Sequence, residues 1–300
     1  MSATLRVSVL LDRSRALRAS DVAAAARHVE DLGLDGLFVG DHLAGAVPML
    51  DGTILLGAAA AATERIALGF AVMVPALRHV AWAAKQIATL QQLSGDRLVL
   101  GLGSGAPIHG RDAWDAVEIP YAQRGARFDA ALGVLADLVT GSGVELRQGR
   151  VLALDPPATM PPIWIGGNSA RALRRAAEHG DGWFPSMAAP ARVAQGAREL
   201  CAEAQRLGRP EPVVAVSCVV RLSAARLTWA LDLVMASLQN GHRAQAAQIP
   251  PVPITGDLIA VAERFDEYRR AGARHLVLGI LGDDWERQCE LLAEARVVLG

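Results

Sequence analysis

The chain has 300 residues, of which 52% are hydrophobic, and its formal net charge at pH 7 is −1. This length and apolar content allow one large domain with a sizeable core. The balanced charge excludes the basic surface that a protein needs to bind a nucleic-acid backbone.

Three cysteines, Cys201, Cys218 and Cys289, lie far apart in the sequence and match neither a disulfide framework nor a CxxC zinc motif. The longest apolar run, 66–77, is too short to span a bilayer, and the N-terminal residues lack the pattern of a signal peptide. We therefore expect a cytoplasmic protein that has neither a membrane partner nor a nucleic-acid partner.

Short apolar runs alternate with amphipathic segments along the chain. The runs predict strands at 5–10, 36–39, 66–72, 97–101, 163–165, 182–184, 213–220 and 275–278. Apolar positions at helical spacing predict helices at 20–31, 53–63, 79–93, 121–139, 169–179, 190–206, 226–239, 257–270 and 284–298. Residues 102–120 and 141–162 are predicted to be insertions, after the fourth strand and before the fifth.

This alternation is typical of parallel strands that are joined by right-handed crossovers. A closed barrel and an open doubly wound sheet both satisfy it. Eight units without an internal boundary favour the barrel, so the predicted fold is α/β, a single (β/α)₈ TIM barrel over residues 1–300.

Unusual residues follow several of the predicted strands, where the active sites of such barrels lie. The segments that follow the second to the sixth strands are Asp41-His42, Ala71-Val72-Met73-Val74-Pro75, Gly101-Leu102-Gly103-Ser104-Gly105, Gly166-Gly167-Asn168-Ser169 and Phe184-Pro185-Ser186. Because these strand ends meet at one mouth, we expect the five segments to form one site.

Gly166-Gly167-Asn168-Ser169 lies between a buried strand and a helix, and two interpretations of it stay open. The glycines and the free N–H groups of the helix start suit a phosphate, with Arg171 nearby. The same residues also suit a tight turn in which Asn168 or Ser169 caps the helix.

Residues 101–106 match the dinucleotide fingerprint GxGxxA, but that motif must open a helix. Here Pro107 and Gly110 follow, and the next helical pattern begins near Tyr121. We therefore expect the glycines to let the backbone pass close to a flat ring. Ser104 is not in a GxSxG elbow, which argues against a serine hydrolase.

Asp41-His42 is a polar pair at the end of a buried strand. A histidine can transfer protons near neutral pH, and a neighbouring carboxylate can orient it or raise its pKa. The alternative is a capping aspartate beside a surface histidine. The other histidines show no metal-ligand spacing, so no protein-bound metal is expected.

Taken together, these segments resemble the luciferase-like monooxygenase superfamily, and within it the oxidoreductases that depend on coenzyme F420. The order and spacing of motifs carry the resemblance over nearly the whole chain; the motifs lie at 33–42, 65–79, 84–90, 93–105, 162–183, 262–272 and 275–278.

The resemblance implies a site for the cofactor. Its ring would lie against the segment after the third strand, with a non-proline cis peptide at Ala71–Val72, and its phosphate would lie on Gly166, Gly167 and Asn168. His42 would contact the ring or serve the proton transfer, with Asp41 as its orienting partner. Homodimers are common in the family.

One position departs from the family pattern. The sugar-phosphate dehydrogenases of the family have an acidic residue after the Gly-x-Gly of the fourth strand, where this chain has Ala106. His109 and Trp114 are candidates to line the substrate pocket instead.

Three functions follow. The first is hydride transfer between F420 and a small organic substrate, at a C=C, C=N or carbonyl bond. The second is an FMN-dependent monooxygenase reaction, and the third is ligand binding without catalysis.

Overall fold

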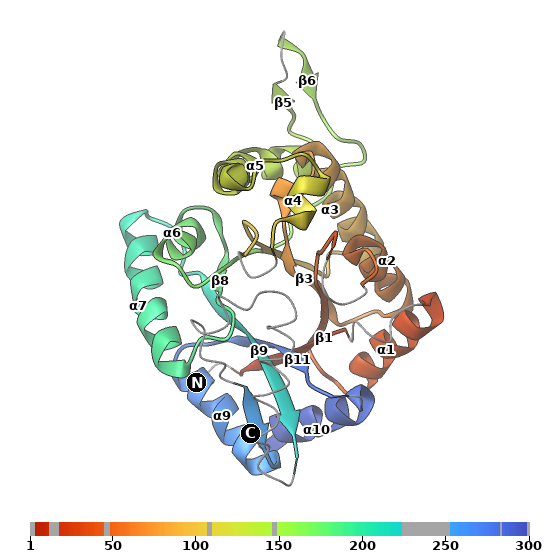
Figure 1. The fold of residues 1–300 in the computed structure, drawn as a ribbon, viewed down its shortest axis with the longest axis vertical. Helices are drawn as coiled ribbons and strands as arrows, with labels where there is room; N and C mark the ends of the chain where they lie inside the picture. The colour runs from red at the N-terminus through yellow and green to blue at the C-terminus, as the bar shows by residue number, and fades with distance from the viewer. Residues whose placement is uncertain are drawn as a thin grey trace.

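Eight parallel strands close into a barrel. Figure 1 shows the helices arranged around its outside. The computed structural model of the chain describes residues 4–11, 18–44, 49–106, 110–145, 149–223, 253–282 and 284–298. The barrel strands are β1 (Arg6–Leu10), β2 (Gly36–Val39), β3 (Ala67–Met73), β4 (Leu98–Leu102), β7 (Ile163–Gly166), β8 (Gly182–Phe184), β9 (Val213–Leu222) and β11 (His275–Ile280).

The sheet closes because β1 pairs in parallel with both β2 and β11, and β8 pairs in parallel with β9. All eight strands lie where the alternating apolar runs predict them. The predicted TIM barrel is confirmed, and an open doubly wound sheet is not formed.

The helices of the outer ring are α1 (Ala19–Asp31), α2 (Gly52–Ala62), α3 (Val80–Ser94), α5 (Arg124–Thr140), α6 (Ala170–His179), α7 (Pro190–Arg206), α9 (Leu258–Arg270) and α10 (Trp285–Val298). The predicted helix at 226–239 lies outside the described residues. Within the part of the chain that is described, no helix has the length and apolar content needed to cross a membrane.

Both predicted insertions contain short elements. The first holds α4 (Asp112–Ala116), and the 3₁₀ turn η3 (Tyr121–Gln123) directly follows this insertion, where the next helix was predicted to begin. The second holds an antiparallel hairpin, β5 (Val144–Glu145) and β6 (Val151–Leu152), which projects away from the barrel in Figure 1. A short strand, β10 (Ile254–Gly256), pairs in parallel with the C-terminal end of β9.

Two apolar layers stabilise the barrel. Outward-facing side chains such as Val9, Leu37 and Leu100 pack against the helices. The interior is filled by Phe38, Val99, Trp164, Phe184, Ala215 and Val277. His275 lies among them, 2% exposed, and its Nε2 is 2.6 Å from Oγ of Ser8. The interior is therefore a packed core, so a ligand must bind at the mouth.

Candidate active site

The loop after β2 is held by the side chain of Asp41. The Oδ2 atom of Asp41 accepts a hydrogen bond of 2.9 Å from the N–H of Val74, and its Oδ1 is 2.5 Å from Nη2 of Arg78. Both partners belong to the segment that follows β3. Asp41 therefore links the end of β2 to the end of β3, and its predicted contact with the ring of His42 stays a prediction.

His42 is half-buried beside this carboxylate. Its imidazole lies over Gly40, because a methyl group in place of the Gly40 hydrogen would lie 3.2 Å from Cδ2 of His42 and 3.5 Å from the sulfur of Met49. A glycine at this position leaves room for the ring to fold back over the strand end.

The peptide bond Ala71–Val72 is cis, as the resemblance implies. The side chain of Val72 lies between the loop after β4 and the end of β7, because a Cβ on Gly103 would be 2.6 Å from Cγ2 of Val72 and a Cβ on Gly166 would be 2.9 Å from Cγ1. Close approach to Val72 thus explains both glycines. Ala71, Val72, Gly103 and Gly166 come together as one small apolar surface from β3, β4 and β7.

Met73 contributes differently from its neighbours. Its side chain is fully buried in the outer apolar layer, away from the barrel interior. Its carbonyl accepts a hydrogen bond of 2.9 Å from the N–H of Gly103. Met73 therefore joins β3 to the loop after β4 through its backbone.

The loop after β4 continues through Ser104, which is half-buried, and Gly105, which has φ +82°. A Cβ on Gly105 would lie 2.6 Å from the indole of Trp114. Trp114 is 3% exposed and packs with Val74 and Ala76. It anchors α4 to the segment after β3, and a contact of Trp114 with substrate stays a prediction, as does one of His109, which lies outside the described residues.

The loop between β7 and α6 shows the capping arrangement. Oγ of Ser169 accepts the N–H of Ala172 at 3.2 Å, and Gly167, with φ +125°, donates its N–H to the carbonyl of Phe184 at 3.2 Å. Asn168 pairs twice with Ser186, donating Nδ2 to its carbonyl at 2.7 Å and accepting its N–H at 3.0 Å. The first N–H groups of α6 remain the donors that a helix offers to an anion.

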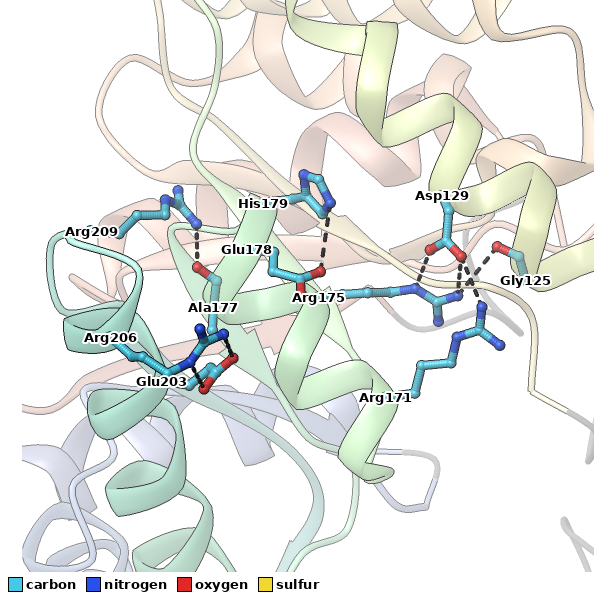
Figure 2. A network of polar contacts seen from close by, with 10 residues as sticks. All are labelled: Gly125, Asp129, Arg171, Arg175, Ala177, Glu178, His179, Glu203, Arg206 and Arg209. Atoms are coloured by element: carbon cyan, nitrogen blue, oxygen red, sulfur yellow. Dashed lines mark hydrogen bonds and ion pairs between the residues drawn. The ribbon is translucent and has the colours of Figure 1, made fainter.

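Arg171, the base beside this loop, is already paired. It extends from α6 to Oδ2 of Asp129 on α5 at 3.0 Å, and Arg175 donates to the same carboxylate at 2.5 Å (Figure 2). The hydrogen bond from Arg175 is the largest cause that lowers the pKa of Asp129, and Arg171 lowers it further. The network fixes α6 against α5, and thereby fixes the start of α6.

Among the described residues, no group of three His, Cys, Asp or Glu side chains gathers closely enough to hold a metal ion. The mouth instead presents an apolar surface, a histidine and the N–H groups at the start of α6. That combination fits a flat ring that carries a phosphate better than it fits a cation.

Sequence reasoning gave two residues of this arrangement no role of their own. Arg78, the partner of Asp41, stood out only as the first charge after the apolar run 66–77 and as part of the motif at 65–79. Ser186 interacts with Asn168 through its backbone, so its side-chain type carries no signal.

Comparison with known proteins gives the family. The model of the luciferase-like monooxygenase family matches residues 3–278. An F420-dependent glucose-6-phosphate dehydrogenase of Nakamurella multipartita is 31% identical over an alignment of 184 residues, which covers 55% of this chain and 51% of that protein. The chain spans about half the length of the curated relatives it matches.

Two solved structures share the fold. An F420-dependent secondary alcohol dehydrogenase in complex with an F420–acetone adduct has a TM-score of 0.82 at 17% identity, with 100% of both chains covered. The oxygenating constituent of 3,6-diketocamphane monooxygenase of Pseudomonas putida, in complex with FMN, has a TM-score of 0.74 at 16% identity and covers 98% of each chain. From the match over residues 3–278, the chain belongs to the luciferase-like monooxygenase family.

Proposed function

We propose that this protein is an oxidoreductase that transfers a hydride between coenzyme F420 and a small organic substrate, at a C=C, C=N or carbonyl bond. The observation that carries the proposal is the apolar surface of Ala71, Val72, Gly103 and Gly166 at the barrel mouth, with His42 on the next loop. Relatives that are named for F420-dependent dehydrogenation support this choice of cofactor.

The cofactor ring would lie on the half-exposed residues Ala71 and Val72, whose own side chains are apolar. Its phosphate would bind at the start of α6, near Asn168 and Ser169. Because the N–H of Gly167 is donated to Phe184, we expect the next N–H groups along the chain to bind the phosphate. The bound cofactor supplies the hydride chemistry.

His42 would move the proton that accompanies hydride transfer. A side chain that transfers protons near neutral pH lowers this barrier only if it lies near the reacting atom, and His42 lies on the loop beside the apolar surface. Ala106 stands where sugar-phosphate dehydrogenases of the family have an acid, so we do not expect a sugar phosphate as substrate.

An FMN-dependent monooxygenase is the second candidate. It is supported by the likeness of the fold to a monooxygenase that binds FMN. The same apolar surface suits either ring. Ligand binding without catalysis is the third candidate, since Ala106 removes one expected acid.

Separate titrations of the purified protein with oxidised F420 and with FMN test the proposal. We expect F420 to bind more tightly, with a change in its absorbance, and Gly167→Val to weaken this binding because φ +125° disfavours a branched side chain. Tight binding of FMN alone would favour the monooxygenase. Binding of F420 without turnover of any alcohol, imine or enone would favour the third candidate.

A homodimer is also part of the proposal. Two large apolar side chains, Ile54 on α2 and Trp82 on α3, are 72% and 70% exposed, which suits burial against a second copy. Light scattering on wild type and on Trp82→Arg tests this: we expect a dimeric mass for wild type and a smaller mass for the variant. A monomeric wild type would remove the dimer from the proposal.

A further inference from the structure

A buried ion pair lies between the two loops of the site that carry His42 and the cis peptide. The side chain of Asp41 is 5% exposed and that of Arg78 is 22% exposed, and their charged atoms are 2.5 Å apart. Such charge-assisted hydrogen bonds are shorter and stronger than neutral ones. Because the pair is largely removed from water, loss of either partner leaves a charge uncompensated.

Asp41 contacts both ends of the segment that follows β3. Val74 comes directly after β3, and Arg78 directly follows the 3₁₀ turn η1 (Pro75–Leu77). One carboxylate therefore accepts a hydrogen bond from each end of the five-residue segment 74–78. Its Oδ2 bonds to Val74 and its Oδ1 bonds to Arg78.

Other elements hold the same segment from its remaining sides. The Nη1 atom of Arg78 donates to Gln86 of α3 at 3.2 Å, and Nε of Arg127 of α5 donates to the carbonyl of Ala76 at 3.2 Å. Trp114 packs against Val74 and Ala76. The contact from the β2 side is the ion pair with Asp41, and His42 directly follows Asp41 in the sequence.

We propose that Asp41 and Arg78 are positioning residues that lock the His42 loop and the cofactor-facing end of β3 at one separation. His42 is the next residue after Asp41, and Val72 is two residues before Val74. A displacement of the carboxylate therefore moves the proton-transfer side chain and the ring-binding surface relative to each other. The cofactor part of this proposal rests on the proposed function, whereas the coupling of the two loops does not.

The test uses full-length wild type, Arg78→Gln, Arg78→Lys and Asp41→Asn. Hydrogen–deuterium exchange is measured in peptides that cover 40–44 and 72–78, and binding of oxidised F420 and of FMN is measured by titration. Arg206→Gln is the matched control, since it breaks an ion pair with Glu203 at the end of α7 (Figure 2).

We expect Arg78→Gln and Asp41→Asn to speed exchange in both peptides and to weaken cofactor binding about tenfold, a size typical of coupling between sites. Arg78→Lys keeps the charge and should retain most of the slow exchange and most of the cofactor affinity of wild type. The control should change neither. Rescue by lysine is a result that a general loss of packing would not give.

Three outcomes would count against the proposal. Exchange at 40–44 that stays at the wild-type rate in Arg78→Gln would show that the loops are not coupled. Faster exchange with unchanged cofactor affinity would reduce the pair to a structural contact. Equal defects in Arg78→Lys and Arg78→Gln would exclude a role for the charge. If wild type bound neither F420 nor FMN, the proposed function would fail, and the exchange data would still decide the coupling.

Discussion

At the base of the barrel two aspartates join neighbouring strands, whereas at the mouth Asp41 joins a strand end to a loop. Asp35 accepts the N–H of Val7 at 2.7 Å and donates its own N–H to the Val7 carbonyl at 2.8 Å. Asp181 does the same with Ile163, at 2.9 Å and 2.7 Å.

The two base aspartates thus repeat one arrangement, each just before the glycine that begins a strand. Both of their partners are strand residues, so the contact sets the register of the barrel. Asp41 has partners in an irregular segment, so its contact sets the shape of the site. This difference predicts that changes at the base lower stability, while changes at the mouth lower binding or turnover.

His42→Ala should give the largest effect at the mouth. Loss of a positioned proton-transfer group typically lowers turnover by about 10²–10⁴-fold, while the half-buried ring contributes little to folding. We expect the variant to keep its melting temperature and to bind cofactor within about tenfold of wild type, as expected of a role in proton transfer rather than binding. Steady-state kinetics with reduced F420 and a ketone, or with oxidised F420 and an alcohol, checks this. Turnover at the wild-type rate would reduce His42 to packing.

His275 in the barrel interior should make the stability of the fold depend on pH. Burial, and to a lesser extent the charge of Arg6, lowers the pKa of His275 from 6.5 to about 3. Between these values the unfolded chain binds the proton and the folded chain does not. Stability is therefore full above pH 6.5 and falls as pH drops, by up to about 1.4 kcal/mol per pH unit.

Denaturant unfolding of wild type and of His275→Asn between pH 7 and pH 5 measures this contribution. Asparagine can still hydrogen-bond to Ser8 but does not titrate, so its stability should fall less steeply over this range. Equal slopes for both proteins would show that another group dominates the acid response.

Asp35→Ala and Asp181→Ala test the base directly. Each leaves a strand N–H without its acceptor, which costs about 1–3 kcal/mol, and Asp35→Ala also removes the partner of Arg296 at 2.9 Å. We expect lower unfolding free energies, with the larger loss for Asp35→Ala, and unchanged cofactor affinity in the folded protein. A change in cofactor affinity without a change in stability would contradict the structural role of the two base aspartates.

Ser169→Ala should give the smallest effect. Loss of a helix cap costs about 1 kcal/mol, and Asp257→Ala removes the matching cap of α9. The two variants should lose similar stability, but only Ser169→Ala should also weaken cofactor binding, because its helix start is the proposed phosphate site. Equal affinities in both variants would place the phosphate elsewhere.

Much of this fold and part of the site could be predicted from the sequence alone. Apolar periodicity is a local property, so the eight strands, and every predicted helix that lies within the described residues, agree with it to within a few residues. The resemblance also placed the cis bond at Ala71–Val72. Sequence spacing did not separate a phosphate loop from a helix cap at Ser169, because the same residue types serve both.

The sequence by itself determined the barrel and the loops that form its mouth, because strand ends of a closed parallel sheet must meet there. Only the tertiary structure decided which side chains use that proximity. Arg78 meets Asp41, Trp114 packs on Gly105, and Val72 fills the space that Gly103 and Gly166 leave. These partners lie on different elements and come together at distances of a few ångströms, which depend on how the whole barrel packs and on no local pattern.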